Sequence, residues 1–282
     1  MTARRGNLLV SESTPTSGPQ QPTKIDPTVA HSARVWNHWL GGKDNFAADR
    51  QVGDQILKVM PALVDSARAD RAFLGRAVRH LTAEAGLRQF LDIGTGLPTA
   101  SNTHEVAQSV APECRVVYVD NDPIVLTHAR ALLVGTPEGA TDYIEADIRD
   151  TTTVLDRARE TLDFTEPVAL MLLGVLNFIP DDAEAAAIIR RLLDAVPSGS
   201  HLAVAHPTAE VHAEAMHEAV RQWNAAGSAP MVLRSPTQIS RWFDGLDLLE
   251  PGVVSCSQWR AEPDDFDAQE QVSQFCAVGR KP

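Results

Sequence analysis

Cysteine is scarce in this chain of 282 residues, which has only Cys114, Cys256 and Cys276. An odd, sparse set without Cys-x-x-Cys spacing argues against a disulfide framework and against a zinc knuckle. We therefore expect no metal site. We also expect reduced thiols, as is usual for a cytoplasmic protein.

Long apolar runs are missing as well. The most apolar segment, residues 168–176, is far shorter than the ~18 apolar residues that a membrane-spanning helix needs. The first residues lack the apolar stretch of a secretory signal. The sequence therefore predicts neither export nor contact with a membrane.

Positive charge is in short supply. The chain has 25 Lys and Arg residues against 37 Asp and Glu residues, a formal net charge of −12. A surface this acidic repels phosphate backbones and anionic lipids. We therefore expect a small-molecule substrate and no nucleic acid partner, while the sequence leaves the oligomeric state open.

The chain divides into three parts by composition. Residues 1–25 are rich in Ser, Thr, Pro, Gly and Gln, a composition typical of a disordered tail. Residues 26–87 have helical periodicity, for example at Phe73, Leu74, Ala77 and Val78, and predict a helical cap or lid. Within them, Asn45 offers an N-cap for a helix that follows. Residues 88–282 then predict one larger domain.

In this larger domain, short strand-like runs alternate with helical patterns. The predicted strands are 89–93, 115–119, 141–145, 168–173 and 201–205, and the predicted helices lie near 99–111, 123–133, 151–161, 181–196 and 208–225. Such alternation predicts an α/β fold with a parallel sheet and helices on both faces. The segments 246–249, 253–259 and 272–278 leave no room for crossover helices, so we expect them to form an antiparallel edge.

One motif indicates a nucleotide cofactor. Residues 90–96, Phe-Leu-Asp-Ile-Gly-Thr-Gly, end the first strand, and Gly94 and Gly96 allow a tight turn close to a ligand. Asp92 would repel a dinucleotide pyrophosphate but would favour the cationic methionine portion of S-adenosylmethionine. The third glycine of G-x-G-x-x-G would fall at Thr99, where it is missing. Both features favour S-adenosylmethionine over NAD.

Two further acids follow successive strands. Asp120 ends the second strand, where a carboxylate can accept both ribose hydroxyls. After the third strand, Asp147 could accept from the adenine amino group and Ile148 could pack on the ring. Each acid alone is more simply a helix cap or a loop residue. Together, at successive strand ends, they predict one cofactor crevice.

With these motifs the sequence resembles the class I S-adenosylmethionine-dependent methyltransferases. More narrowly, it resembles a bacterial S-adenosyl methyltransferase family of unassigned substrate over residues 28–282. The matching segments are 40–45, 90–99, 118–123, 176–181 and 251–254. The resemblance implies a Rossmann-like fold and a bound S-adenosylmethionine. It also implies cofactor contacts at Asp92, Gly94, Gly96, Asp120, Asn121, Asp147 and Ile148, with residues 174–177, beginning at Gly174, beside the cofactor.

Pro98 departs from the D-x-G-x-G-x-G form of the broad class. Proline still suits a helix start but lacks an N–H. We therefore expect the methionine carboxylate to use a hydroxyl such as that of Thr95 or Thr99.

No catalytic residue can be assigned from the sequence, because methyl transfer mainly needs alignment of the reactants and exclusion of water. His206 and Asn177 follow strands and could face a substrate, although a hydrogen-bonded loop histidine explains His206 equally simply. The spacing of His201, His206, His212 and His217 disfavours a zinc site. A polar and aromatic cluster could form a lid around Gly41 and Gly42, or could simply pack as a helix and turn; it comprises Arg34, Trp36, Trp39, Lys43, Asp44 and Asn45.

Three functions remain open at this point. The first is a methyltransferase that acts on a small molecule. The second is a non-catalytic sensor or scaffold that binds S-adenosylmethionine, because binding the cofactor does not prove that a substrate pocket exists. The third is an NAD(P)-dependent oxidoreductase, which Asp92 and the missing glycine disfavour.

Overall fold

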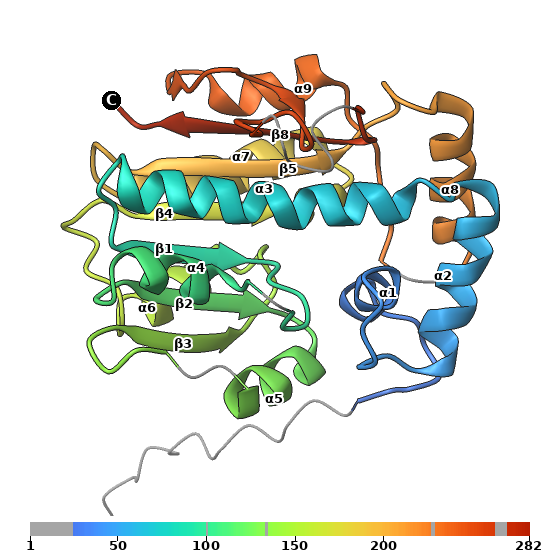
Figure 1. Ribbon diagram of the computed structural model, residues 1–282, viewed down its shortest axis with the longest axis horizontal. Coiled ribbons are helices and arrows are strands. Elements are labelled where there is room, and N and C mark those ends of the chain that lie inside the picture. Colours follow the sequence, from blue (N-terminus) through green and yellow to red (C-terminus); the bar gives the residue numbers. More distant parts are fainter. Residues whose placement is uncertain (1–24, 100, 133–134, 227–228, 263–269) are drawn as a thin grey trace, which may run out of the picture.

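A mixed sheet forms the centre of the protein (Figure 1). The structure is a computed structural model that describes residues 25–99, 101–132, 135–226, 229–262 and 270–282, so nearly all of the predicted tail lies outside the described residues. The strands are β1 (Gln89–Ile93), β2 (Arg115–Asp120), β3 (Ala140–Glu145), β4 (Ala169–Leu173), β5 (His201–Pro207), β6 (Asp247–Leu248), β7 (Val254–Ser255) and β8 (Gln274–Arg280).

The strand order is β3-β2-β1-β4-β5-β8-β6, with β7 also paired to β8. Strands β1 to β5 pair in parallel, whereas β8 is antiparallel to β5, β6 and β7. The predicted parallel sheet with an antiparallel edge is therefore confirmed.

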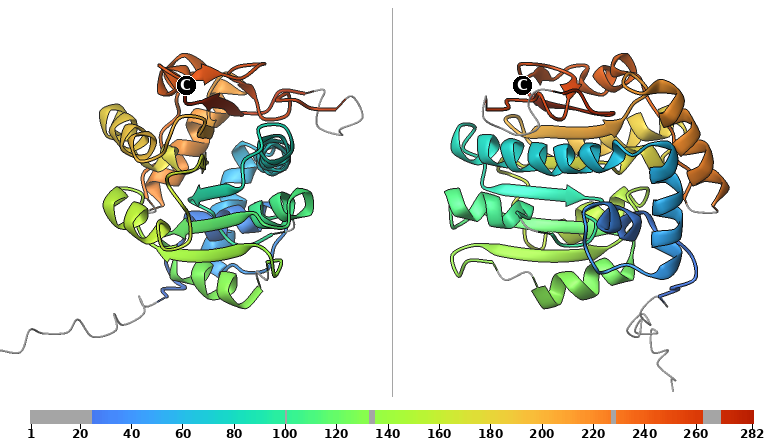
Figure 2. Two further views of the ribbon diagram at one scale, coloured as in Figure 1. Left: turned by 90° about the vertical axis from the view of Figure 1, so that its left-hand side faces the viewer. Right: turned by 45° about the vertical axis from the view of Figure 1, so that its right-hand side comes forward.

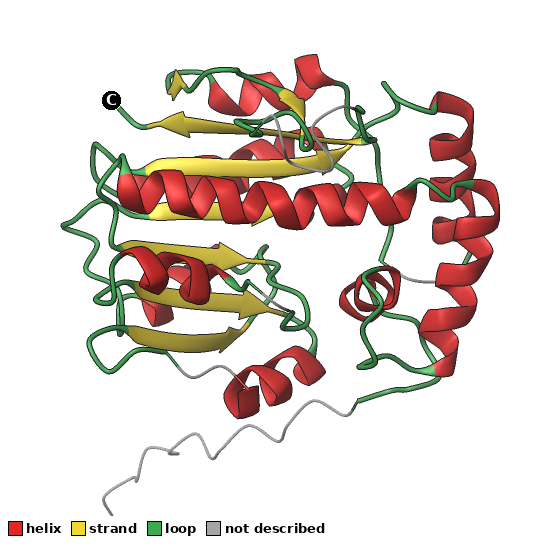
Figure 3. Ribbon diagram, viewed as in Figure 1, coloured by secondary structure: helices red, strands yellow, loops and turns green. Residues whose placement is uncertain are grey.

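Helices cover both faces of this sheet (Figures 2 and 3). Phe90 points to the face covered by α3 (Leu63–Ala83) and α4 (Thr103–Val110). Its neighbour Leu91 points to the face covered by α6 (Thr151–Ala158), α7 (Asp182–Asp194) and α9 (Pro236–Ser240). Successive residues of a strand face opposite sides. Because both sides are covered, every residue of β1 is buried, which explains its nearly continuous apolar sequence.

Three helices lie together beyond the carboxyl ends of the parallel strands, at the right of Figure 1: α1 (Ser32–Trp39), α2 (Ala47–Val59) and α8 (Ala213–Ala225). Their apolar side chains form a separate small core that includes Val35, Ile56 and Trp223. The helix α5 (Pro123–Leu132) follows β2, and the short 3-10 helices η1 (Leu176–Phe178) and η2 (Arg241–Phe243) complete the elements. In the following, α1 and α2 are called the cap.

Three local predictions are wrong. The helix expected from residue 99 begins at Thr103, because Asn102 donates its N–H to Glu105 and caps the helix, so Pro98 does not open it. Asn45 does not cap α2: its side chain donates to Asn37 and to the carbonyl of Gly42. The strand expected at 253–259 is limited to β7, because residues 256–260 form turns.

Candidate functional site

A cavity of about 250 Å³ opens at the carboxyl ends of β1 to β4. This edge of a parallel sheet is where α/β proteins bind their ligands. The structure brings all nine residues of the predicted cofactor site to the wall of this cavity: Asp92, Gly94, Thr95, Gly96, Asp120, Asn121, Asp147, Ile148 and Gly174.

Two glycines shape the turn after β1. Gly94 has φ +78°, and its N–H donates to the carbonyl of Val119 at 2.8 Å. A Cβ atom at Gly94 would lie 2.5 Å from Cβ of Val175, so no side chain fits there. Gly96 has φ +68°, and a Cβ there would meet no atom within 4 Å. The turn is thus tightly packed at Gly94 and open towards the cavity at Gly96.

Asp120 holds this turn in place. Its Oδ2 accepts the N–H of Gly96 at 2.8 Å, and its Oδ1 accepts the N–H of Asp122 at 2.9 Å. Burial raises the pKa of the Asp120 carboxyl, while these two backbone donors lower it. A carboxylate has about four acceptor positions. Asp120 therefore keeps two for a ligand while it fixes the loop.

Asp92 is buried near the end of β1, just before the turn. Its Oδ2 accepts the hydroxyl proton of Thr103 at 2.6 Å, at the start of α4. Burial raises the pKa of the Asp92 carboxyl from 3.8 to about 6. A bound positive charge beside Asp92 would favour the ionised form and lower this pKa again.

The elevated pKa of Asp92 makes a prediction about stability. A carboxyl with a raised folded pKa binds its proton more tightly in the folded state, so its contribution to stability declines as pH rises from about 4 to 7. We expect the stability of Asp92→Asn relative to the wild type to increase over this range by up to about 3 kcal/mol. Urea unfolding of the ligand-free proteins at several pH values measures it.

Asp65→Asn is a suitable control for this series, because Asp65 lies on α3 with a side chain that is 60% exposed. This variant reports the effect of an Asp-to-Asn substitution without burial. A stability difference between Asp92→Asn and wild type that stays flat from pH 4 to 7 would contradict a buried, hard-to-ionise Asp92.

The other predicted residues lie along the rim and floor of the cavity. Ile148 is buried, whereas Asn121 is exposed. Asp147 is partly exposed and accepts the N–H of Arg149 at 2.8 Å, and its Oδ2 also lies 3.4 Å from the Arg149 guanidinium. Gly174 has φ +69° and donates to the carbonyl of Ala205.

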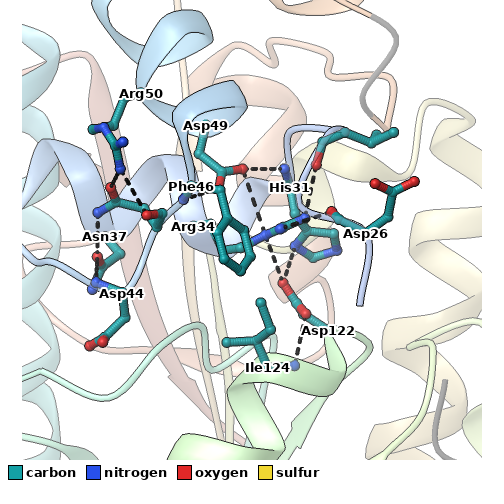
Figure 4. Close-up of polar contacts among 12 residues, drawn as sticks. Asp26, His31, Arg34, Asn37, Asp44, Phe46, Asp49, Arg50, Asp122 and Ile124 are labelled. Carbon is teal, nitrogen blue, oxygen red and sulfur yellow. Dashed lines mark hydrogen bonds and ion pairs between the residues drawn. The ribbon is translucent and has the colours of Figure 1, made fainter. Parts of the chain in front are cut away.

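Charged groups tie the cap to the sheet domain (Figure 4). Oδ2 of Asp122 lies 3.0 Å from Nδ1 of His31 and 3.4 Å from Nε of Arg34. The same Nε lies 3.6 Å from Oδ1 of Asp49 in α2. Since the N–H of Asp122 donates to Asp120, the cap is connected directly to the loop that carries Asp120. Of the predicted lid residues, Trp36 and Trp39 line the cavity.

Several polar residues of the cavity were not predicted from the sequence, among them Asp70 and Arg71 on α3 and Gln274 on β8. Asp70 is buried, and its Oδ1 accepts from Nε2 of Gln274 at 3.2 Å. Burial raises the pKa of the Asp70 carboxyl to about 6. A signal was present, since Asp70 falls on the apolar stripe that continues through Leu74.

The two residues considered for substrate contact behave differently. His206 does not face the cavity: its Nε2 accepts from Arg234 at 3.0 Å, and its Nδ1 donates to the carbonyl of Pro207 at 2.8 Å. Burial, together with the guanidinium of Arg234, lowers the pKa of His206 to about 3. The simpler interpretation of His206 as a hydrogen-bonded residue therefore holds, but the residue lies within β5 and not in a loop. Asn177 does line the cavity and is buried, and its Oδ1 has no hydrogen-bond partner among the described residues.

A family model described as S-adenosyl methyltransferase matches residues 18–282. The chain belongs to the S-adenosyl methyltransferase family. The predicted enzyme class, methyltransferase, and the predicted cofactor, S-adenosylmethionine, are thereby confirmed. The alternative of an NAD(P)-dependent oxidoreductase is set aside.

Solved structures agree with this assignment. A DUF574 family protein from Streptomyces avermitilis MA-4680 is 48% identical over 92% of this chain and 100% of that one, with a TM-score of 0.87. A methyltransferase candidate from Thermobifida fusca YX is 41% identical over 90% and 96% of the two chains, with a TM-score of 0.82. No curated protein matches the chain.

A more distant structure supports the fold alone. The magnesium protoporphyrin IX methyltransferase of Synechocystis PCC 6803, with S-adenosylhomocysteine bound, is 13% identical over 88% of this chain and 93% of that one, with a TM-score of 0.51. This similarity agrees with the class I Rossmann-like fold predicted for the methyltransferase.

The cavity of this methyltransferase fits S-adenosylmethionine in its donor and acceptor groups. The space beside Gly96 leaves room for a ligand against the backbone, and the carboxylates of Asp92 and Asp120 are of a kind that can accept from cationic and hydroxyl groups. Among the described residues no cluster of His, Cys, Asp or Glu has a metal-binding arrangement. None of the described helices has both the length and the apolar character to cross a bilayer.

Proposed function

We propose that this methyltransferase acts on a small molecule that it encloses beneath the cap, next to S-adenosylmethionine held by the nine predicted residues. The observation that carries this proposal is a single cavity lined both by those nine residues and by side chains of α1, α2 and α8. A cavity covered by helices suits a compact acceptor better than a polymer.

Each part of the cofactor has a partner of suitable chemistry in the proposed site. Asp120 would accept from the ribose hydroxyls, and Asp147 with Ile148 would contact the adenine. Asp92 would favour the positively charged methionine end, whose carboxylate would approach the open backbone at Gly96 and the hydroxyl of Thr95. When bound, S-adenosylmethionine supplies a methyl group that its sulfonium already activates.

The chain's own contribution is to orient the acceptor and to exclude water. In this proposal residues 26–87 supply the cover: the helices α1 and α2 close the cavity, and the contacts of Asp122 with His31 and Arg34 hold them down. The net charge of −12 supports an acceptor other than nucleic acid, and the three buried, free cysteines support a cytoplasmic location.

The cofactor site is tested by Asp120→Asn. Losing the charged hydrogen bonds to the ribose is expected to weaken binding of S-adenosylhomocysteine by about 1–3 kcal/mol, or about 5- to 150-fold in Kd. Isothermal titration measures this change. The control is Asp156→Asn on α6, where the carboxylate is exposed and pairs with Arg159. If both variants bind S-adenosylhomocysteine with wild-type affinity, Asp120 does not belong to the site.

The small-molecule acceptor is tested separately with methyl-labelled S-adenosylmethionine and cell extract split by size. The proposal expects label in the low-molecular-mass fraction. Label confined to protein or nucleic acid would overturn it, and repeated failure to label any fraction would favour a non-catalytic binding protein.

A further inference from the structure

The cavity extends beyond the cofactor residues into an apolar region, which we call the acceptor chamber. Its walls come from α1, α2, α3, α8 and η1 and include Trp36, Ile56, Leu63, Phe178, Met216 and Trp223. On α8 the lining residues Met216, Ala219, Val220 and Trp223 follow the i, i+3, i+4, i+7 spacing of one helix face. The chamber is thus a built apolar pocket that adjoins the proposed cofactor site.

Aromatic rings make up much of this chamber. The rings of Phe178 and Trp223 have centroids 5.9 Å apart at 44°, and those of Trp36 and Trp39 lie 5.9 Å apart at 60°. All four residues line the cavity. Tilted aromatic rings present π faces to a ligand, and such faces attract cations as well as apolar groups.

The helix α3 connects the chamber to the cofactor residues. Leu63, Ser66, Asp70 and Leu74 all line the cavity and share one face of the helix. Leu63 belongs to the apolar core of the cap, whereas Leu74 packs with the sheet. At ~1.5 Å per residue, Asp70 lies roughly 10 Å along the helix from Leu63. It therefore stands between the chamber and the turn that carries Asp92.

Two polar side chains at this junction can accept hydrogen bonds from a ligand, although Arg71, a donor, lines the cavity as well. Asp70 is buried and accepts from Gln274. Oδ1 of Asn177 is buried, and no residue in the described part of the chain donates to it. A buried acceptor left unsatisfied is unfavourable, so a ligand that donates to it gains affinity. A carboxylate and an amide oxygen facing an aromatic chamber select a ligand with several N–H donors and positive charge.

We propose that the methyl acceptor is an amphipathic amine, with an apolar, ring-sized body in the acceptor chamber and its nitrogen bound by Asp70 and Asn177. This inference rests on the proposed function, because it needs the cofactor beside Gly96 and Gly174. The Asp70 carboxylate at this junction is placed to act as a general base for the ammonium proton.

The transfer balances in atoms and charge. The ammonium gives its proton to Asp70, and the freed nitrogen lone pair forms the new N–C bond. The S–C bond breaks with its electron pair remaining on sulfur, so the positive charge passes from sulfur to the methylated nitrogen. Asp70 returns its proton to water when the product leaves.

Three probes of matched shape test the acceptor class: phenethylamine, 2-phenylethanol and 3-phenylpropanoate. Each is titrated by calorimetry into the full chain saturated with S-adenosylhomocysteine. We expect phenethylamine to bind at least about tenfold more tightly than the alcohol, and the carboxylate to bind most weakly. Equal binding of amine and alcohol, or preference for the carboxylate, would overturn the proposal.

Variants then assign the preference to residues. Asp70→Asn is expected to bring the amine and the alcohol to similar affinity while S-adenosylhomocysteine binds as in the wild type. Asn177→Ala is expected to weaken amine binding without loss of stability, since none of the residues that the structure describes donates to its Oδ1. Asp65→Asn, an exposed acid on the same helix, is the matched control and should keep the tenfold preference.

These measurements separate the two levels of the proposal. If S-adenosylhomocysteine does not bind the wild type, the proposed cofactor site itself fails. If it binds the wild type but not Asp70→Asn, then Asp70 serves the cofactor and the amine assignment is wrong. Loss of the amine preference alone in Asp70→Asn supports it.

Discussion

Replacing Gly94 with alanine is expected to damage this methyltransferase severely. The backbone at Gly94 has φ +78°, a conformation that costs an alanine about 1–2 kcal/mol. The added Cβ would also lie 2.5 Å from Cβ of Val175, and overpacking of this kind costs about 1–3 kcal/mol. Either the strain remains, and the free energy of unfolding falls by about 2–5 kcal/mol, or the turn moves away.

A displaced turn would change the site, because Gly96 donates to Asp120 from the same loop. We therefore expect Gly94→Ala to lower either the unfolding free energy or the affinity for S-adenosylhomocysteine, with the two losses together reaching about 2–5 kcal/mol. Urea unfolding and isothermal titration on one preparation measure both. Normal values in both measurements would show that the turn tolerates a side chain.

A second substitution separates the two causes. Val175→Gly removes the atoms that a Cβ at residue 94 would meet, so the double variant should recover the steric part of the loss but not the backbone part. Gly75→Ala is the matched control, since a Cβ at this position of α3 meets nothing within 4 Å. Alanine in a helix interior should leave stability unchanged or raise it by about 0.5–1 kcal/mol.

The sequence was sufficient to predict the sheet because its strands are covered on both faces. Burial on both sides requires apolar residues at consecutive positions, as in β1, β4 and β5, and such runs are recognisable without any partner in view. The carboxyl ends of parallel strands necessarily meet at one edge. Asp92, Asp120 and Asp147 could therefore be assigned to one cavity from their order alone.

The predicted helix starts were wrong where side chains form hydrogen bonds that residue spacing does not reveal. Pro98 and Thr99 suggest a helix start, yet Asn102 bonds back to Thr99 and forward to Glu105, so that the helix begins four residues later than expected. Asn45 is a residue type common at helix N-caps, but its amide instead donates to Asn37 and to the carbonyl of Gly42.

The acceptor side of the cavity was the hardest part to predict, because it assembles from distant segments. Asp70 meets Gln274 across 204 positions of the chain. Trp36 and Trp223 both line the cavity although one lies in α1 and the other in α8. Pairwise contacts at such separations leave no periodic pattern. The local sequence sign of this part of the cavity was Asp70, an acid within the apolar stripe of α3.

Arg234→Ala is expected to have the other large effect. This buried guanidinium donates to the carbonyls of Leu176 and Ile179, to Asp182 and to His206, at 2.7–3.1 Å. Its removal takes away the donor to the Ile179 carbonyl and to Nε2 of His206, whereas the Leu176 carbonyl keeps the N–H of Ile179 and Asp182 keeps Gln238. The free energy of unfolding should fall by about 2–6 kcal/mol, because each buried acceptor left unsatisfied costs about 1–3 kcal/mol.

The same bonds make Arg234 a positioning residue for the cavity. Leu176 and Ile179 flank Asn177 in and after η1, so loss of their donor should loosen this turn and increase hydrogen exchange of its amides. Arg234→Lys should restore little of the stability, because an ammonium cannot reach two carbonyls, a carboxylate and an imidazole as a planar guanidinium does. Arg241→Ala, at a nearby exposed arginine, controls for loss of charge. If Arg234→Ala unfolded at the wild-type urea concentration with η1 equally protected, η1 would be held by its own packing, and Asn177 would owe its position to Phe178 and Trp223 instead.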